Sequence, residues 1–533
     1  MIHPVKIIHL ILLSLLLSGV QQVQAQILQP YRFEKERKSS DEDFTIISLK
    51  EDGLALVREK NKYKSGNKTW EVILLDSTLQ EKNTIELEID QRKNLIGYEH
   101  APGSLYLLFK GGDNFKLPLD LITIQVARAE IERHEIKTEL NFQLSQFIRV
   151  ESNFIFGGYI NSEPAVLLYN TITENLKVLP GFFQKQTELV DLRPNYNQTF
   201  NAILIDRSDR DQRKILFRTF DAAGKELVED SAPIEDKYFL QTSISGTLIN
   251  DDLMVLGTYG SRNSKQSNGF YALVIDPFND NPIKFTAFGE LSSYLDQLPP
   301  KRAKKIKDKT QNALNQKRIP DFVNYVMPYR VEERAEGYIM LAETYVPSNT
   351  VNRYPNNYPY PYGYTPYPYY SPFWGYYPGT YNRLYNPYYG YGPNTTTTSD
   401  EIKGVQTVLV AFNSKGQVLW DYSLKFEEIR MNSLQQIADY HVHDNKLLIL
   451  YKKESELKGK IITLDEKQSQ EVTEKIKLAN DSDEIRSESK SLGFVRNWYE
   501  NNFYVWGQQS LSNKEKGSEG NRQVFYINKI SFH

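Results

Sequence analysis

Short apolar runs recur along almost the whole chain, and the two runs of each pair are separated by a polar turn or loop. In the clearest example, the apolar run Leu447 to Tyr451 is followed by a polar loop and a second run, Ile461 to Leu464. Runs of this length are too short for a typical helix and fit strands that are buried on both faces. The pattern therefore predicts repeated hairpins of buried strands.

Eight such units can be read along the sequence, and the first five starts lie about 50 residues apart. A period of this length made of short strands is typical of β-propeller blades. Blades stack face to face, which covers their middle strands on both sides. We predict an all-β fold, a β-propeller of about eight four-stranded blades, with seven blades as the alternative. The units begin at Gly53, Gly103, Asn153, Asn201, Asp252, Gly337, Asn445 and Asn502.

Two insertions interrupt the repeat. The first, residues 292–326, contains the stretch KRAKKIKDKTQNALNQKR, whose good helix formers and sparse apolar positions predict a basic surface helix. Such a helix either docks on an acidic partner or phospholipid headgroups, or covers the propeller as a solvated element. The second, residues 349–400, holds fifteen tyrosines and eight prolines between Tyr354 and Tyr391. Proline blocks helix and central strand, so this insertion is predicted to be an irregular loop.

The tyrosine-rich loop is a candidate binding element. Tyrosine is amphipathic and has few torsions to freeze, so dense tyrosine favours contact with glycans, peptides or other tyrosine-rich chains. The alternative is a low-complexity spacer, or a loop that folds back over the propeller face. The candidate partner-binding residues are Tyr358, Tyr362, Tyr367, Trp374, Tyr377 and Tyr388.

The N-terminal residues 1–25 have the features of a cleaved signal peptide. Lys6 supplies positive charge, Ile7 to Leu17 form an apolar core, and Ala25 ends a small-residue cleavage motif. An uncleaved anchor is the alternative. We expect an exported protein that is periplasmic, envelope-associated or secreted, with residues 26–533 as one propeller domain and no transmembrane segment after cleavage. Tyr31 to Arg37 is predicted either to close the last blade or to form a solvated arm.

The amino-acid composition excludes several kinds of chemical site. The chain has no cysteine, which excludes disulfides, thiolate metal sites and a cysteine nucleophile. Its net charge of -3, from 64 basic and 67 acidic residues, gives no general attraction to nucleic acid. No phosphate-binding loop or nucleophile elbow is found, and we expect no cofactor.

One short motif has metal-ligand residue types. On a strand, Asp439, His441 and His443 would share one face, because side chains alternate with a period of two. Two imidazoles and a carboxylate are ligands that zinc accepts. The alternative is a polar strand end near the central channel.

The stretch Leu409 to Phe426, LVAFNSKGQVLWDYSLKF, resembles the repeat of quinoprotein-type β-propellers, in which a tryptophan packs between blades. That broad group includes quinone-dependent dehydrogenases and non-catalytic scaffolds. The adjacent cysteines that the dehydrogenases commonly carry are absent from this chain. The resemblance therefore implies a propeller of the scaffold type.

The sequence favours a non-enzymatic binding scaffold for a protein or glycan partner at the cell envelope or outside the cell. One alternative is a carbohydrate hydrolase or lyase with its site in the channel, since that chemistry needs few residues at the right separation. Another is a structural protein that associates with itself through the tyrosine-rich loop. A fold does not decide among these hypotheses.

Overall fold

The computed structural model describes most of the chain between residues 27 and 532. The described residues are 27–38, 43–64, 66–111, 118–209, 212–246, 253–262, 264, 266–276, 278–279, 282–346, 382–383, 402–431, 434–466, 468–489, 493–513, 515 and 517–532.

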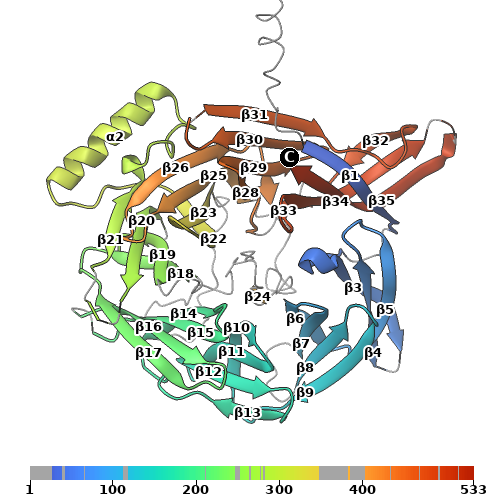
Figure 1. Cartoon of the computed structure of the whole chain (residues 1–533), viewed down its shortest axis with the longest axis horizontal. Helices are drawn as coiled ribbons and strands as arrows, with labels where there is room; N and C mark the ends of the chain where they lie inside the picture. Colours follow the sequence, from blue (N-terminus) through green and yellow to red (C-terminus); the bar gives the residue numbers. More distant parts are fainter. Residues whose placement is uncertain are drawn as a thin grey trace, which may run out of the picture.

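Eight antiparallel sheets stand around a common axis as the blades of a propeller (Figure 1). The prediction of eight blades is confirmed, and the seven-blade alternative is not needed. Blades 1 and 2 contain β2 (Thr45–Ser48), β3 (Leu54–Lys64), β4 (Asn67–Leu75), β5 (Glu81–Asp90), β6 (Lys93–Ala101), β7 (Ser104–Gly111), β8 (Leu119–Gln125) and β9 (Glu130–Ile136). Blades 3 and 4 contain β10 (Phe142–Val150), β11 (Asn153–Ile160), β12 (Glu163–Asn170), β13 (Asn175–Val178), β14 (Thr187–Pro194), β15 (Thr199–Asp206), β16 (Lys214–Asp221) and β17 (Glu226–Pro233).

The second half of the ring repeats this plan with additions. Blades 5 and 6 contain β18 (Phe239–Ser245), β19 (Leu253–Gly260), β20 (Ser267–Ile275), β21 (Lys284–Ala287), β22 (Tyr325–Arg334), β23 (Gly337–Val346), β25 (Ile402–Phe412), β26 (Val418–Lys425) and β27 (Arg430–Met431). Blades 7 and 8 contain β28 (Asp439–His443), β29 (Lys446–Lys453), β30 (Glu456–Thr463), β31 (Gln468–Lys475), β32 (Asp483–Glu488), β33 (Val495–Asn497), β34 (Asn502–Asn513), β35 (Gly517–Phe532) and β1 (Ile27–Glu36).

The eight predicted hairpins are the two middle strands of the eight blades. In blade 7, the six central residues of β29 are all buried, whereas the outermost strand, β31, is almost wholly exposed. Hydrophobic clusters fill the spaces between neighbouring blades, and one of them joins side chains of β3, β4, β7 and β8. Burial on both faces explains why the middle strands are continuous apolar runs without alternation.

Glycine starts two of these units for a steric reason. Gly53 has φ +120° and Gly337 has φ +140°. A Cβ atom at Gly53 would lie 1.8 Å from the carbonyl oxygen of Leu75, and one at Gly337 would lie 1.9 Å from that of Phe412. Each glycine therefore lets the second strand of a blade begin directly against the third.

The innermost strands carry a recurring irregularity. In β6, β10, β14, β18 and β22 the register with the second strand shifts by one residue a few positions after the strand begins. In blade 4, for example, the shift lies between Leu189 and Asp191. Such a bulge bends a strand and increases its twist, so the second half of each of these five strands is turned relative to the first half.

Strand β1 closes the ring. It pairs antiparallel with β35, with Ile27 opposite Phe532 and Glu36 opposite Val524, and thereby becomes the outermost strand of blade 8. The closing strand predicted at Tyr31 to Arg37 is therefore confirmed, although it begins earlier, at Ile27. This pairing covers the edge that β35 would otherwise expose.

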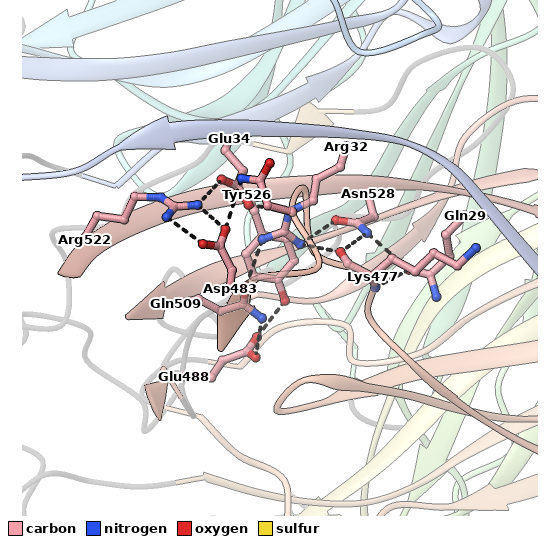
Figure 2. A network of polar contacts seen from close by, with 11 residues as sticks. Gln29, Arg32, Glu34, Lys477, Asp483, Glu488, Gln509, Arg522, Tyr526 and Asn528 are labelled. Atoms are coloured by element: carbon pink, nitrogen blue, oxygen red, sulfur yellow. Dashed lines mark hydrogen bonds and ion pairs between the residues drawn. The ribbon is translucent and has the colours of Figure 1, made fainter. Parts of the chain in front are cut away.

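A polar network anchors the closing strand (Figure 2). The guanidinium of Arg32 donates to Asn528 Oδ1, to Gln509 Oε1 and to the carbonyl of Lys477, each at 2.9 Å. Its Nε donates to Glu34 Oε1 at 2.7 Å. Arg32 thus ties β1 to β34, to β35 and to the connection between blades 7 and 8.

The first insertion forms the predicted helix, α2 (Pro300–Asn315), which ends earlier than the basic stretch does. It lies on the outside of the ring beside blades 5 and 6 (Figure 1). Ala303 and Ile306 pack against the hydrophobic cluster of these blades, and buried Thr310 contacts η2 (Phe288–Glu290) at Gly289. No helix among the described residues is long and apolar enough to cross a membrane.

The second insertion leaves blade 6 beside the point where the first one ends. Tyr325 at the start of β22 is opposite Tyr345 near the end of β23, and their rings are 5.7 Å apart. Within the insertion, only β24 (Asn382–Arg383) is described, and it pairs with β10 of blade 3. The predicted partner-binding residues, Tyr358, Tyr362, Tyr367, Trp374, Tyr377 and Tyr388, lie outside the described residues.

The turn in the quinoprotein-like stretch has the predicted form. Asn413 Oδ1 accepts hydrogen bonds from the backbone N–H groups of Lys415 and Gln417. The turn contacts blade 5, since Lys284 Nζ donates to the carbonyl oxygen of Lys415 at 2.5 Å. Trp420 is partly buried against the hydrophobic cluster that joins blades 5, 6 and 7.

Candidate site on the propeller axis

The inner strands bring polar side chains from several blades towards the axis. In blade 1, β2 is followed by η1 (Lys50–Asp52), the short blue helix at the inner side of that blade in Figure 1. Lys50 has φ 59°, a left-handed conformation that few non-glycine residues adopt. Its Nζ donates to the carbonyl oxygen of Trp498 in blade 8 at 3.5 Å. Lys50 therefore bridges the two blades that meet where the ring closes.

Arg330 of β22 is the centre of a buried ion-pair network. Its Nη1 lies 2.9 Å from Asp439 Oδ1 of the neighbouring blade, and its Nη2 contacts Glu332. Arg334 reaches the other oxygen of Glu332 at 2.5 Å. Arg330 also stacks on the Tyr440 ring, 4.4 Å from its centroid. Since Arg330 is only 3% exposed and Asp439 is fully buried, this network rigidly joins blades 6 and 7.

The charges of this network act on Lys50. Burial and the positive charge of Arg330 lower the pKa of Lys50 to about 7, whereas Asp439 and Glu332 oppose the shift. An amine with this pKa is present in both charged and neutral forms near neutral pH. Lys50 is therefore able to accept or release a proton under ordinary conditions.

Two aromatic side chains complete the group. Tyr196, in the turn after β14, is 52% exposed, and its pKa is raised by partial desolvation and by the charges of Glu332 and Glu333. His441 of β28 is half-buried and lies 3.0 Å from Asn501 Oδ1 through Nε2. Burial lowers the pKa of His441, so its ring is neutral at pH 7. We call these residues the axial cluster: Lys50, Tyr196, Arg330, Glu332, Asp439 and His441.

Buried carboxylates hold the inner strands at their relative positions. Asp191 of blade 4 accepts from the backbone N–H of Ser245 in blade 5 at 2.9 Å. Asp439 Oδ2 likewise accepts from the N–H of Asn497 in blade 8 at 2.9 Å. Glu343 of blade 6 accepts from the N–H groups of Ile437 and Ala438, which precede β28. These hydrogen bonds satisfy buried donors and fix neighbouring blades to each other.

The structure places the three predicted metal ligands on the inner strand of blade 7. The rings of His441 and His443 stack with centroids 6.2 Å apart, but Asp439 is engaged with Arg330. The Nε2 of exposed His443 is 3.1 Å from Asp444 Oδ2. Within the described part of the chain, no group of three or more histidine and acidic side chains is placed to hold a metal ion. Metal binding by this strand stays a prediction.

Sequence reasoning missed Lys50, Tyr196, Arg330 and Glu332. Arg330 and Glu332 gave a usable signal, because they are charged residues inside a strand that is otherwise largely apolar, YVMPYRVEER. Lys50 and Tyr196 gave none, since each occupies a turn between strands, where polar residues are common. Their role depends on which turns meet at the axis.

Comparison with known proteins adds little to this description. No protein-family model matches the chain, and no curated protein matches it. Similar solved structures include the polysaccharide lyase Uly1, at 8% identity and a TM-score of 0.38 over 92% of this chain and 99% of that one. The β-propeller domain of the Trilobed protease from Pyrococcus furiosus gives 8% identity and a TM-score of 0.34 over 82% and 93%. These weak likenesses carry no argument about activity.

Proposed function

We propose that this protein is an exported binding propeller that engages a glycan or protein partner, outside the cell or at its envelope, through the axial cluster. The observation that carries the proposal is that polar side chains of blades 1, 4, 6 and 7 act on one another at the axis. Rigid blades hold these groups, as a preformed binding site requires.

The electrostatics of the cluster favour a ligand with an anionic group. Arg330 and Asp439 neutralise each other, and Glu332 is paired with both Arg330 and Arg334. Near pH 7, about half of the Lys50 side chains are protonated, because the pKa is about 7. A carboxylate bound beside Lys50 raises the pKa of its amine and draws a proton from solution. Binding is therefore coupled to proton uptake.

Calorimetry tests this coupling. A panel of neutral and carboxylated glycans and acidic peptides is titrated into the protein at pH 7 in two buffers of different ionisation enthalpy. We expect an anionic ligand to bind with uptake of a fraction of a proton, and Lys50→Met to remove the uptake and weaken binding by roughly ten-fold. The matched control is Lys185→Met, which changes an exposed lysine outside the axial cluster, in the segment before β14 of blade 4. Equal binding by the Lys50 and Lys185 variants would contradict the proposal.

A carbohydrate lyase is the second candidate, and the pKa of Lys50 favours it. A neutral amine can abstract a proton next to a sugar carboxylate, and the hydroxyl of Tyr196 can protonate the leaving oxygen. Hydrolysis is less well supported, because Asp439 and Glu332 are already bound to Arg330. Incubation with uronate polysaccharides distinguishes the two functions. A lyase gives unsaturated products that absorb in the ultraviolet and are lost in Lys50→Met, whereas a binding protein gives none.

Export and self-association stay proposals as well. N-terminal sequencing of protein recovered from outside the cytoplasm would support export if the mature chain begins at Gln26. Self-association through the tyrosine-rich insertion predicts oligomers in sedimentation that disappear when residues 349–399 are replaced by a short linker. Oligomers that persist in this variant would assign the contact to the propeller.

A further inference from the structure

The outer face of α2 carries an unbalanced cluster of positive charge. Residues 300–318 contain eight lysines and arginines and one aspartate, a net charge of +7. Since the whole chain has a net charge of -3, the remaining residues together carry -10. The cluster is thus a local cationic feature on an otherwise acidic molecule.

The helix is attached to the propeller by its other face. Ala303 and Ile306 pack against the hydrophobic cluster of blades 5 and 6, and Thr310 is buried. Lys307 takes part in this attachment, because its Nζ donates to the carbonyl oxygen of Ser292 at 3.0 Å. The apolar residues of the helix are therefore used for docking, and none is left on the outer face to enter a membrane.

The remaining cations point outward and have no ion-pair partner among the described residues. Lys301, Lys305 and Lys309 are exposed and four residues apart, which places them in one row along the helix with a rise of about 6 Å between neighbours. Arg302 and Lys304 flank this row and are also exposed.

This arrangement is unfavourable for the isolated helix. Like charges four residues apart repel each other. Lys301 and Arg302 also occupy the first turn, which contains no acidic residue, and cations at a helix N-terminus oppose the helix dipole. Asp308, four residues after Lys304, is the one carboxylate of the helix and offsets only part of these costs. The excess of positive charge is left for an external anion.

We propose that the row Lys301, Lys305 and Lys309, flanked by Arg302 and Lys304, is a docking surface for a linear acidic polysaccharide. A narrow polyanion can follow the row without contacting the acidic remainder of the molecule. A planar anionic membrane would contact the row and also the acidic surface around it, which would repel it. The outer face also lacks aromatic side chains on which the bases of a single-stranded nucleic acid would stack. This site is separate from the axial cluster and does not depend on the function proposed for it.

The test compares two triple variants with the same change in net charge. Lys301→Gln, Lys305→Gln and Lys309→Gln are combined in one protein, and Lys185→Gln, Lys214→Gln and Lys475→Gln, all exposed elsewhere, are combined in the control. Glutamine keeps good helix propensity, so the α2 variant is expected to fold with an unchanged or higher Tm. Binding to immobilised heparin and polygalacturonate is measured over a series of salt concentrations.

We expect the α2 triple to lose roughly ten-fold or more in affinity, with a shallower salt dependence, and the control triple to bind like the parent. Equal weakening of both variants would show attraction to net charge alone and would overturn the proposal. The proposal would also be overturned if neither glycan bound, or if single-stranded DNA or phosphatidylglycerol vesicles bound in preference to both glycans.

Discussion

At the scale of single residues, buried titratable groups make the stability of this propeller depend on pH. Glu343 is one of the carboxylates that join blades 6 and 7, and it is 3% exposed. Burial raises its pKa to about 8, against the opposing effect of the hydrogen bonds from Ala438 and Ile437. Its ordinary value is 4.5, so between these two pH values the folded protein holds a proton that the unfolded chain releases.

The sign of the effect follows from this proton. The contribution of Glu343 to the free energy of unfolding is greatest below pH 4.5 and is lost as the pH rises through about 8. Glu343→Gln keeps an acceptor oxygen for both backbone N–H groups and removes the titration. Its stability relative to the parent is therefore expected to increase across this range, by on the order of 5 kcal/mol.

Urea denaturation at a series of pH values measures the difference. Glu336→Gln is the control, because Glu336 is exposed in the turn before β23 and should not alter the pH dependence. Parallel curves for the parent and Glu343→Gln would show that Glu343 is ionised in the folded protein throughout the range, contrary to our expectation.

At the scale of elements, the start of β3 depends on a glycine that no other residue replaces. Gly53→Ala forces a Cβ to within 1.8 Å of the Leu75 carbonyl oxygen at φ +120°. We expect it to lower the free energy of unfolding by on the order of 2–4 kcal/mol. Gly66→Ala is the matched control, because Gly66 has φ +85° but no atom within 4 Å of the added Cβ, and should cost about 1 kcal/mol.

Chemical denaturation of the two alanine variants separates the collision from the backbone conformation that both share. Similar losses at the two sites would mean that β3 and β4 move apart without strain, and the steric explanation for Gly53 would then be wrong.

Elements of this fold were predictable because their signals are local. The continuous apolar run Leu447 to Tyr451 predicts a strand that is buried on both faces, and this prediction uses the local sequence alone. The helix of the first insertion was also predictable, although it ends at Asn315, within the basic stretch. The axial cluster was predictable only in part. Asp439 and His441 were singled out from the sequence, whereas Lys50 and Tyr196 are 146 positions apart in the chain and only ring closure brings both near the charges of β22.

At the scale of the whole molecule, the ring depends on the contacts of one closing strand. Arg32→Ala removes four hydrogen bonds from β1 and leaves Asn528 and Gln509 with unused acceptors. We expect a loss of on the order of 2–4 kcal/mol and earlier proteolysis of the N-terminal strand. Limited proteolysis followed by mass spectrometry identifies the cleavage sites.

Lys35→Ala is the control for this prediction. Lys35 lies on the same strand, but its side chain is 33% exposed and its only described ion pair, with Glu81, spans 3.4 Å. Such pairs contribute less than about 1 kcal/mol. If both variants release β1 equally, the strand is held by its backbone pairing and not by Arg32.

The pairing of β1 with β35 also has a consequence for the time course of folding. A chain synthesised from its N-terminus presents β1 first, yet that strand has no partner until β35 exists, almost five hundred residues later. Contacts so distant in sequence form slowly, and unpaired strand edges invite association with other chains. A polypeptide that stops short of β35 cannot complete blade 8. Only chains translated as far as β35 can therefore form the closed ring.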